Sequence, residues 1–250
     1  MKTTWLFGAS GTIGFETCSE LLSRGDNVLA FCSSKESKIK LDLHFANLDN
    51  FESRIIDLNQ ISSIQEVIMY AEDSKYAPTH VIFLARGSSP INLIPSDQEW
   101  VTSSISDLMV SLIIPIRICI QLLDKNKTSL KTITLVSSQY GVVSQDPKLY
   151  EDPEKQMSAM YSAIRGGIIS GVRALAITGA QRKVRINCLT LGGISESTGF
   201  PLKNSIESRL PSENMIPAAD AANWLLFFAS EKSAGAIGSS VIVDNGWTII

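Results

Sequence analysis

TTWLFGASGTIG, residues 3–14, is the stretch of this sequence that indicates its fold. Residues 3–7 are apolar or β-branched and predict a short buried strand, and a helical pattern continues from the glycines through Leu22. Glycines at the start of such a helix leave backbone N–H groups open to a pyrophosphate, and neighbouring hydroxyls can add contacts. The order of strand, glycine turn and helix therefore predicts a dinucleotide-binding turn, with contacts from Gly8, Ser10, Gly11, Thr12, Ile13 and Gly14.

Strand-like and helical patterns alternate along the rest of the chain. The expected strands cover residues 3–7, 27–32, 54–58, 80–84, 132–136, 184–190 and 240–243, with helices that include 97–123 and 218–229. This alternation predicts the α/β class, as a Rossmann-type doubly wound parallel sheet of about seven strands with helices on both faces. Because the 250 residues contain no internal repeat or low-complexity linker, we expect a single domain over residues 1–250.

Composition excludes several classes of function. The net charge of -3 gives no basic field, so no nucleic-acid partner is expected. The four cysteines form no CxxC pair and no cluster with the two histidines, which predicts reduced thiols and no metal site. The chain runs from Met1 into a strand without a signal peptide, so we expect a cytoplasmic protein. The apolar stretch 108–123 is interrupted by Pro115 and Arg117 and is too short to span a bilayer, so no membrane partner is expected.

The end of the second expected strand bears on the choice of cofactor. NAD binders carry an acid there that holds the 2′-hydroxyl of the adenosine ribose. Here the strand ends at Cys32 and continues as Ser33-Ser34-Lys35, with a cation and no acid. NADP is therefore the preferred cofactor and NAD the alternative, with Ser33 and Lys35 as contacts, although Lys35 could equally be a solvated loop residue.

Further cofactor contacts are expected at the ends of later strands. Asp57, followed by Leu58, closes the third expected strand and could accept a hydrogen bond from an adenine amino group, or could cap the next helix. The loop after the fourth strand contributes Ala85, Arg86 and Gly87 at the edge where open α/β sheets bind ligands. After the sixth strand, Gly192 and Ile194 begin a polar loop, residues 194–217, that is expected to act as a lid over the substrate.

Tyr161 and Arg165 form the expected reaction centre. They lie at i and i+4 of MYSAIRGGIISGVRALA, residues 160–176, and therefore share one face of a helix. A cation beside a tyrosine favours the phenolate, which makes the side chain a usable acid or base. Ser138, after the fifth strand, could hydrogen-bond a substrate carbonyl. The alternatives are an accidental pair on a surface helix and a serine that caps its own loop.

Taken in chain order, these motifs resemble the short-chain dehydrogenase/reductase family over essentially the whole chain. They are the glycine turn, Asp57-Leu58, Ser138, Tyr161 with a cation four residues on, RINCLTLGG at 185–193 and VIVDNGW at 241–247. The segment 140–169, with extra residues between the serine and the tyrosine, is most similar to reductases of flagellin modification and surface-sugar biosynthesis. The resemblance implies that Tyr161 exchanges a proton with the substrate oxygen while a hydride moves between a nicotinamide and the carbonyl carbon, and that Ser138 steadies that oxygen.

The sequence departs from the family pattern at several of these positions. Arg165 replaces the lysine that holds the nicotinamide ribose; it keeps the charge, but its rigid fork fits ribose hydroxyls differently. Ser111 replaces the asparagine that organises a proton-relay water. Arg86 stands where the Asn-Asn-Ala-Gly loop has a glycine, and the GxxGxxG spacing of residues 8–14 is that of the extended, sugar-nucleotide branch.

Three functions follow from these motifs and departures. The first is an NAD(P)-dependent oxidoreductase that acts on a ketone or secondary alcohol, possibly a sugar derivative. The second is a degenerate member that keeps the fold as a nucleotide-binding or scaffold protein, and the third is a sugar-nucleotide epimerase or dehydratase. The apolar helices 108–123 and 164–177 resemble the family's dimer-forming pair, so a homodimer or homotetramer acting on a small-molecule substrate is expected.

Overall fold

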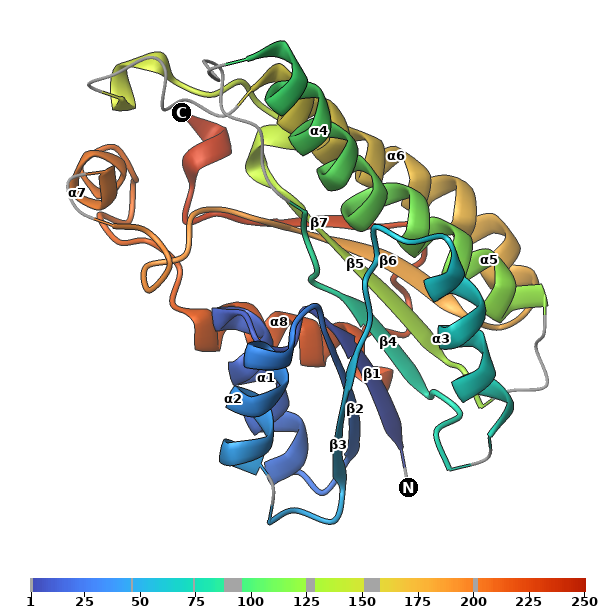
Figure 1. The fold of residues 1–250 in the computed structure, drawn as a ribbon. Coiled ribbons are helices and arrows are strands. Elements are labelled where there is room, and N and C mark those ends of the chain that lie inside the picture. The colour runs from blue at the N-terminus through green and yellow to red at the C-terminus, as the bar shows by residue number, and fades with distance from the viewer. Residues whose placement is uncertain are drawn as a thin grey trace.

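The strands in the described part of the chain lie in one parallel sheet. The structure, a computed structural model, describes residues 2–45, 47–73, 75–87, 96–124, 129–150, 158–199 and 202–250. Figure 1 shows seven strands in the order β3-β2-β1-β4-β5-β6-β7. They are β1 Thr3–Phe7, β2 Asn27–Cys32, β3 Phe51–Ile55, β4 His80–Phe83, β5 Thr132–Ser138, β6 Arg185–Leu191 and β7 Ser240–Val243. The predicted α/β class and doubly wound parallel sheet are confirmed.

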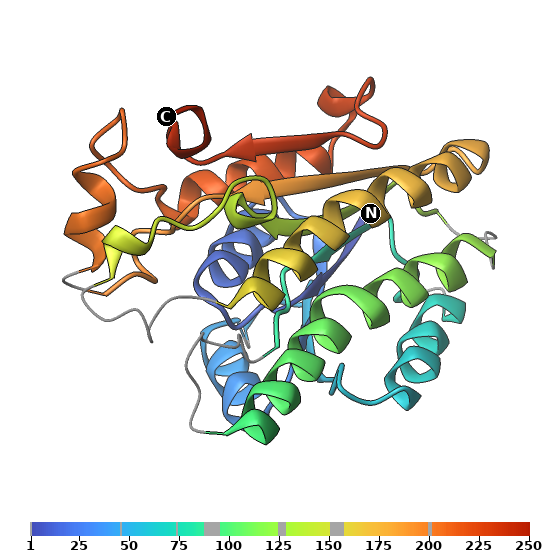
Figure 2. The same cartoon turned by 90° about the horizontal axis from the view of Figure 1, so that it is seen from above.

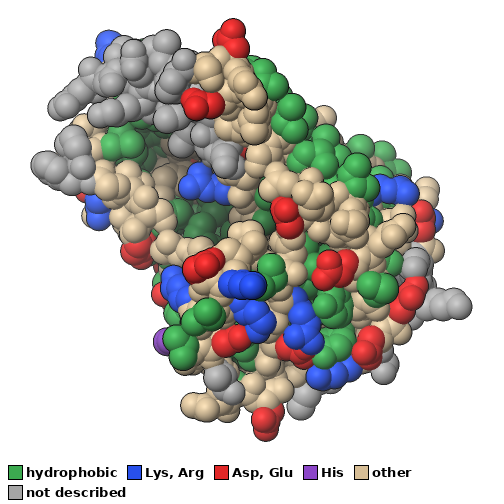
Figure 3. Space-filling view, in the orientation of Figure 1, with side chains coloured by type: hydrophobic (Ala, Val, Ile, Leu, Met, Phe, Trp, Pro, Cys, Tyr) green, Lys and Arg blue, Asp and Glu red, His purple; other side chains and the backbone are tan. Residues whose placement is uncertain are grey.

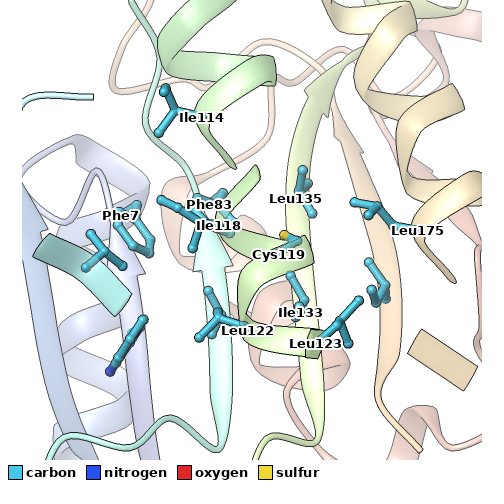
Figure 4. Close-up of a cluster of buried hydrophobic side chains, with 14 of the residues drawn as sticks. Phe7, Phe83, Ile114, Ile118, Cys119, Leu122, Leu123, Ile133, Leu135 and Leu175 are labelled. Carbon is cyan, nitrogen blue, oxygen red and sulfur yellow. The ribbon is translucent and has the colours of Figure 1, made fainter. Parts of the chain in front are cut away.

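Helices cover both faces of this sheet. On one face lie α1 (Thr12–Ser23), α2 (Lys35–Phe45) and α8 (Ala218–Phe228), and on the other α3 (Ser62–Glu72), α4 (Asp97–Leu108), α5 (Ile114–Asp124) and α6 (Ala159–Gln181). Successive side chains of β1 point to opposite faces of the sheet, so Trp5 and Phe7 pack in one core and Leu6 packs in the other. Figure 4 shows Phe7 and Phe83 packed with α5 side chains such as Ile118 and Leu122.

The third strand lies three residues earlier than predicted. It covers Phe51–Ile55, in register with β2 from Val28 opposite Phe51 to Cys32 opposite Ile55, instead of residues 54–58. This edge strand carries polar side chains, so its sequence lacks the apolar run on which the prediction depended. Ile56 and Leu58 are buried in the loop beyond the strand instead. The fifth strand, β5, begins where predicted but ends two residues later than predicted, so that it includes Ser138.

One long helical run packs along the sheet and contains residues of the candidate site. Residues 97–124 form α4, a π-helical turn at Met109–Ile113 and α5 without interruption, as predicted for 97–123. By length and composition this run could cross a membrane, but a core helix passes the same test, and Ile114, Ile118 and Leu122 pack into the core. Figure 2 shows the run beside α6, where Gly167 and Gly171 approach Leu112 and Ile116.

His80 on β4 makes the fold sensitive to acid. Its Nδ1 lies 2.8 Å from the hydroxyl of Thr132 on β5, and the residue is 3% exposed. Burial, with the charges of Lys2 and Arg185, lowers the pKa of His80 from 6.5 to about 4. Between these values the unfolded chain binds a proton that the folded chain does not, so the free energy of unfolding decreases as the pH falls from 6.5 towards 4.

In the wild type, protonation linked to His80 should lower the free energy of unfolding by about 2 kcal/mol between about pH 7 and pH 5. His80→Gln removes this group, so the variant should lose about 2 kcal/mol less over the same range. Urea unfolding at both pH values measures the effect, with the exposed His44→Gln as the control. If wild type and His80→Gln lose equal stability over this range, His80 is not the group responsible.

Candidate active site

A cavity of about 470 Å³ opens at the carboxyl ends of β1, β2 and β4, the edge where open parallel sheets bind ligands. Figure 3 shows the molecule hollowed between the lobe that carries α7 (Leu202–Glu207) and the main body, with a Lys or Arg side chain visible in the hollow. The cavity is lined by many of the residues predicted to bind a cofactor, namely Gly8, Ser10, Gly11, Ser33, Asp57, Leu58, Ala85, Arg86 and Gly87. Its lining does not include the other predicted cofactor contacts, which are Thr12, Ile13, Gly14, Lys35, Tyr161, Arg165, Gly192 and Ile194.

The three glycines of the first turn serve different purposes. Gly8 has φ +83°, and a Cβ there would lie 2.7 Å from the backbone N of Ala85. A Cβ on Gly14 would lie 2.3 Å from the carbonyl oxygen of Gly8. Gly11 is different, since its Cβ would meet no atom closer than 3.5 Å and would stand at the cavity. Gly8 and Gly14 are therefore required for the fold of the turn, whereas Gly11 leaves space for a ligand.

The adenosine end of the cavity carries a serine and a distant lysine. Ser33 is exposed and lines the cavity, whereas Lys35 is the first residue of α2, exposed and outside the lining. A second lysine, which the sequence patterns did not single out, reaches the turn from α2: Lys40 Nζ donates to the carbonyl of Ser10 at 3.5 Å. The corner next to the predicted ribose position thus combines a cation with hydroxyl groups.

Asp57 closes a local turn at the cavity wall. Its Oδ1 accepts hydrogen bonds from the backbone N and the side-chain amide of Asn59, at 2.9 and 3.1 Å. The alternative that Asp57 caps the next helix is wrong, because α3 begins at Ser62 after Ile61, which makes no side-chain cap. Asp57 itself is exposed and lines the cavity.

Two neighbouring serines at the end of β5 have separate partners. Ser137 is buried, and its hydroxyl donates to the backbone carbonyl of Arg165 at 2.8 Å, which joins β5 to α6. Ser138 points to the other side, where its Oγ accepts from the backbone N of Tyr140 at 3.3 Å. Ser138 therefore caps the turn at Gln139–Gly141, as the alternative interpretation proposed, and its hydroxyl proton stays available for a substrate oxygen.

Tyr161 and Arg165 lie together near the start of α6, as their spacing predicted, but with an unexpected orientation. The guanidinium carbon of Arg165 lies 4.5 Å from the centre of the Tyr161 ring. The same guanidinium donates through Nη2 to both carboxylate oxygens of Asp107, at 2.7 and 3.0 Å. Ser111 is also turned to this group, because its hydroxyl donates to Asp107 Oδ1 at 2.6 Å. The two residues that depart from the family pattern thus share one buried carboxylate.

Two further phenols, not assigned from the sequence, lie close to Tyr161. Tyr140 hydrogen-bonds Tyr150, and both interact electrostatically with Tyr161. Burial raises the pKa of Tyr140 well above its ordinary range, and burial likewise raises the pKa of Tyr150. Both side chains therefore stay protonated beside the reaction centre, and Tyr140 is the donor in the hydrogen bond between them. Their positions after Ser138, within the extra segment before Tyr161, were the available signal.

The predicted lid contacts both the glycine turn and the extra segment. Ile194 pairs with Ile216 at its base, and Ser197 donates to the hydroxyl of Thr12 at 3.0 Å. Near its middle, Arg209 pairs with Asp146 of the extra segment. A small apolar cluster also joins the lid to the extra segment. It consists of Leu149, Ile206, Leu210, Met215 and Trp247. A Cβ on Gly192 would lie 2.8 Å from the Cα of Asp244, so this glycine permits close packing of β6 and the chain after β7.

Comparison with known proteins identifies the family. A family model described as enoyl-(acyl carrier protein) reductase matches residues 8–248. The chain belongs to the short-chain dehydrogenase/reductase family. Members of this family are oxidoreductases with a nicotinamide cofactor, so the predicted enzyme class is confirmed.

Relatives of this short-chain dehydrogenase/reductase match along nearly its whole length. It is 24% identical over 256 residues to post-translational flagellin modification protein A of Campylobacter coli, with 98% of each chain covered. It is 23% identical over 256 residues to acetoacetyl-CoA reductase of Acinetobacter sp., with 98% of this chain and 97% of the relative covered. A short chain dehydrogenase from Leptospira borgpetersenii with bound NAD+ superposes with a TM-score of 0.81 at 23% identity, covering 99% and 92% of the two chains.

Proposed function

We propose that this short-chain dehydrogenase/reductase is a cytoplasmic NADP-preferring enzyme that reduces a keto group, or oxidises the matching secondary alcohol, on a sugar derivative. The observation that carries the proposal is the cavity at the glycine turn, with Ser138 and Tyr161 on the neighbouring strand and helix. The sugar derivative is inferred from the similarity to a flagellin modification protein and from the phenols beside Tyr161, which supply hydrogen bonds to hydroxyl groups. The four buried, unpaired cysteines are consistent with a reducing compartment.

A dinucleotide suits the residues at the cavity. Gly11 offers an open backbone at the start of α1, where N–H groups favour phosphate oxygens, and Asp57 offers an acceptor for an amino group. When bound, the nicotinamide supplies or accepts the hydride. Tyr161 holds at its phenolic oxygen the proton that passes to or from the substrate oxygen, and Ser138 donates its hydroxyl to the same oxygen. Tyr140 and Tyr150 help to exclude water from this end.

The cofactor preference gives a first test. We expect NADPH to raise the melting temperature of the chain more than NADH does at equal concentration. Ser33→Asp, which places a carboxylate at the predicted 2′-phosphate position, is expected to weaken NADPH binding about tenfold or more and to favour NADH. Ser33→Asn, of similar size and without charge, is the matched control. No stabilisation of the wild type by either cofactor would contradict the proposed function.

A second candidate function is supported by the contacts of Arg165. Its guanidinium is paired with buried Asp107, and Ser111 is turned to the same carboxylate, so two positions of the family's catalytic set have other partners. These contacts suit a nucleotide-binding or scaffold protein without turnover. Such a protein would be stabilised by NADPH and would reduce no member of a panel of keto-sugars and simple ketones, whereas an enzyme would oxidise NADPH with at least one.

We further propose that the chain assembles as a homodimer or homotetramer through the outer faces of α4, α5 and α6. Apolar side chains stand exposed on α4 (Val101 and Ile105), on the π-helical turn that joins α4 to α5 (Ile113) and on α6 (Ile177). Light scattering from the purified chain measures the assembly directly, and the mass of a single chain at working concentration would contradict this proposal.

A further inference from the structure

Asp107 is the most deeply buried charged side chain near the reaction centre. Its residue is 0% exposed, and it lies on α4, one turn before Ser111. Its two oxygens accept three hydrogen bonds, two from Nη2 of Arg165 and one from the hydroxyl of Ser111. Every one of these donors is itself at most 5% exposed. The carboxylate is therefore paired and hydrogen-bonded, as a buried charge must be.

This pairing determines where the guanidinium of Arg165 lies. The backbone of Arg165 is fixed from the other side, because Ser137 donates to its carbonyl and Gly141 packs so closely that a Cβ there would lie 2.7 Å from the carbonyl carbon of Arg165. With the backbone and Nη2 both held, the guanidinium carbon lies over the Tyr161 ring, 4.5 Å from its centre. A cation at this position is attracted by the ring.

The arrangement leaves Arg165 little freedom to bind a cofactor. A ribose contact that drew Nη2 away from Asp107 would leave the carboxylate buried without its counter-charge, which is strongly unfavourable. Arg165 therefore has a buried partner at Asp107 and a neighbour at Tyr161, and it does not belong to the lining of the cavity.

We propose that Asp107 is a positioning residue of this site, which holds the guanidinium of Arg165 against the Tyr161 ring and thereby assigns Arg165 to the tyrosine instead of to the cofactor ribose. The inference rests on the proposed function and deepens it. The lysine of the family has two roles, a positive charge beside the tyrosine and a contact with the nicotinamide ribose. In this chain Arg165 would keep the first role and lose the second.

The test removes both charges together. Asp107→Leu/Arg165→Met replaces a buried ion pair by apolar side chains of similar size, a change that folded proteins commonly tolerate. The control Asp124→Leu/Arg182→Met removes a second Asp–Arg pair between the same helical run and α6, with the same sequence separation of 58 residues but at an exposed site. For each protein we would measure the melting temperature, the NADPH dissociation constant by fluorescence quenching, and kcat with the keto compound that the wild type reduces fastest.

We expect the buried double variant to lose turnover and to keep cofactor binding. The buried double variant should stay folded and bind NADPH within about twofold of wild type, while its kcat falls about tenfold or more. The exposed control should match the wild type in all three measurements. Two results would overturn the proposal: a kcat within twofold of wild type, or NADPH binding weakened tenfold or more, which would assign the guanidinium to the cofactor.

Asp107→Asn provides a second variant that keeps the shape of the side chain. It leaves the hydrogen bond from Ser111 possible but removes the charge that holds Arg165, so kcat should fall while NADPH binding stays close to wild type. Unchanged kcat in a folded Asp107→Asn protein contradicts the positioning role. A wild type that neither binds NADPH nor reduces a keto compound contradicts the proposed function itself, and the two failures are thus distinguishable.

Discussion

Tyr161→Phe is expected to lower kcat by about 10²–10⁴-fold while NADPH binding stays within about twofold of wild type. The phenolic oxygen is the proposed proton donor and acceptor, and the substitution removes that oxygen alone. The ring remains, so its contact with the guanidinium of Arg165 at 4.5 Å is preserved and the fold around α6 should not change. Steady-state turnover with NADPH and a keto compound, together with fluorescence quenching by NADPH, measures the two quantities separately.

The matched control is Tyr150→Phe, which removes a phenolic oxygen from the same cluster without touching the proposed acid. It should reduce kcat far less than Tyr161→Phe, because Tyr150 accepts a hydrogen bond from Tyr140 and supplies no proton to the reaction. If the two variants lose equal activity, the proton comes from the cluster as a whole. Unchanged turnover in Tyr161→Phe would remove this residue from the reaction.

The fold could be read from the sequence where burial on both faces leaves an uninterrupted apolar run. The strands at Thr3–Phe7 and Asn27–Cys32 lie within the predicted limits, and the helical run 97–124 was predicted within one residue. The edge strand Ser240–Val243 is only partly buried, but its apolar sequence also placed it correctly. The third strand was misplaced because its sequence lacks such a run. It lies at the edge of the sheet with polar side chains, while the apolar residues that follow it are buried by a loop and not by strand pairing.

The site was predictable where function depends on one local segment. The glycine turn, Ser33, Asp57 and the loop at residues 85–87 are each placed at a strand end by local sequence, and the structure brings them to one cavity. Asp107 is different. It contacts Arg165 across 58 residues, and an acid within a helix carries no local sign of a partner on another helix. Its position four residues before Ser111 was the one available hint, because that spacing places both side chains on one helix face.

The partners of Ser111 and Arg165 change how their departures from the family pattern are understood. Taken singly, each replacement suggests a lost function. In the structure both side chains donate to one carboxylate, so the two replacements and Asp107 form a connected group. Reversion of one member alone, such as Arg165→Lys, would then replace the planar guanidinium, whose Nη2 donates to both oxygens of Asp107, by a compact ammonium group on a differently shaped side chain.

Gly11→Val is expected to weaken NADPH binding about a hundredfold, or about 2.7 kcal/mol, with little change in melting temperature. Gly11 has φ -73° and ψ 166°, extended values that valine adopts readily, and the nearest atom to an added Cβ is 3.5 Å away. The added methyl groups would stand at the cavity, where the backbone has to approach a pyrophosphate closely. The protein should therefore fold normally and lose its ligand.

Two other glycines separate this effect from a loss of folding. Gly14→Ala places a Cβ 2.3 Å from the carbonyl oxygen of Gly8 and should reduce the free energy of unfolding by about 1–3 kcal/mol, since the backbone of the turn has to move. Gly235→Val has no neighbouring atom within 4 Å and should affect neither folding nor binding. Urea unfolding measures the stability of the three variants, and fluorescence quenching by NADPH measures their affinity for the cofactor. If Gly11→Val binds NADPH as tightly as wild type, the pyrophosphate does not lie at this turn, and the cavity must hold a different ligand.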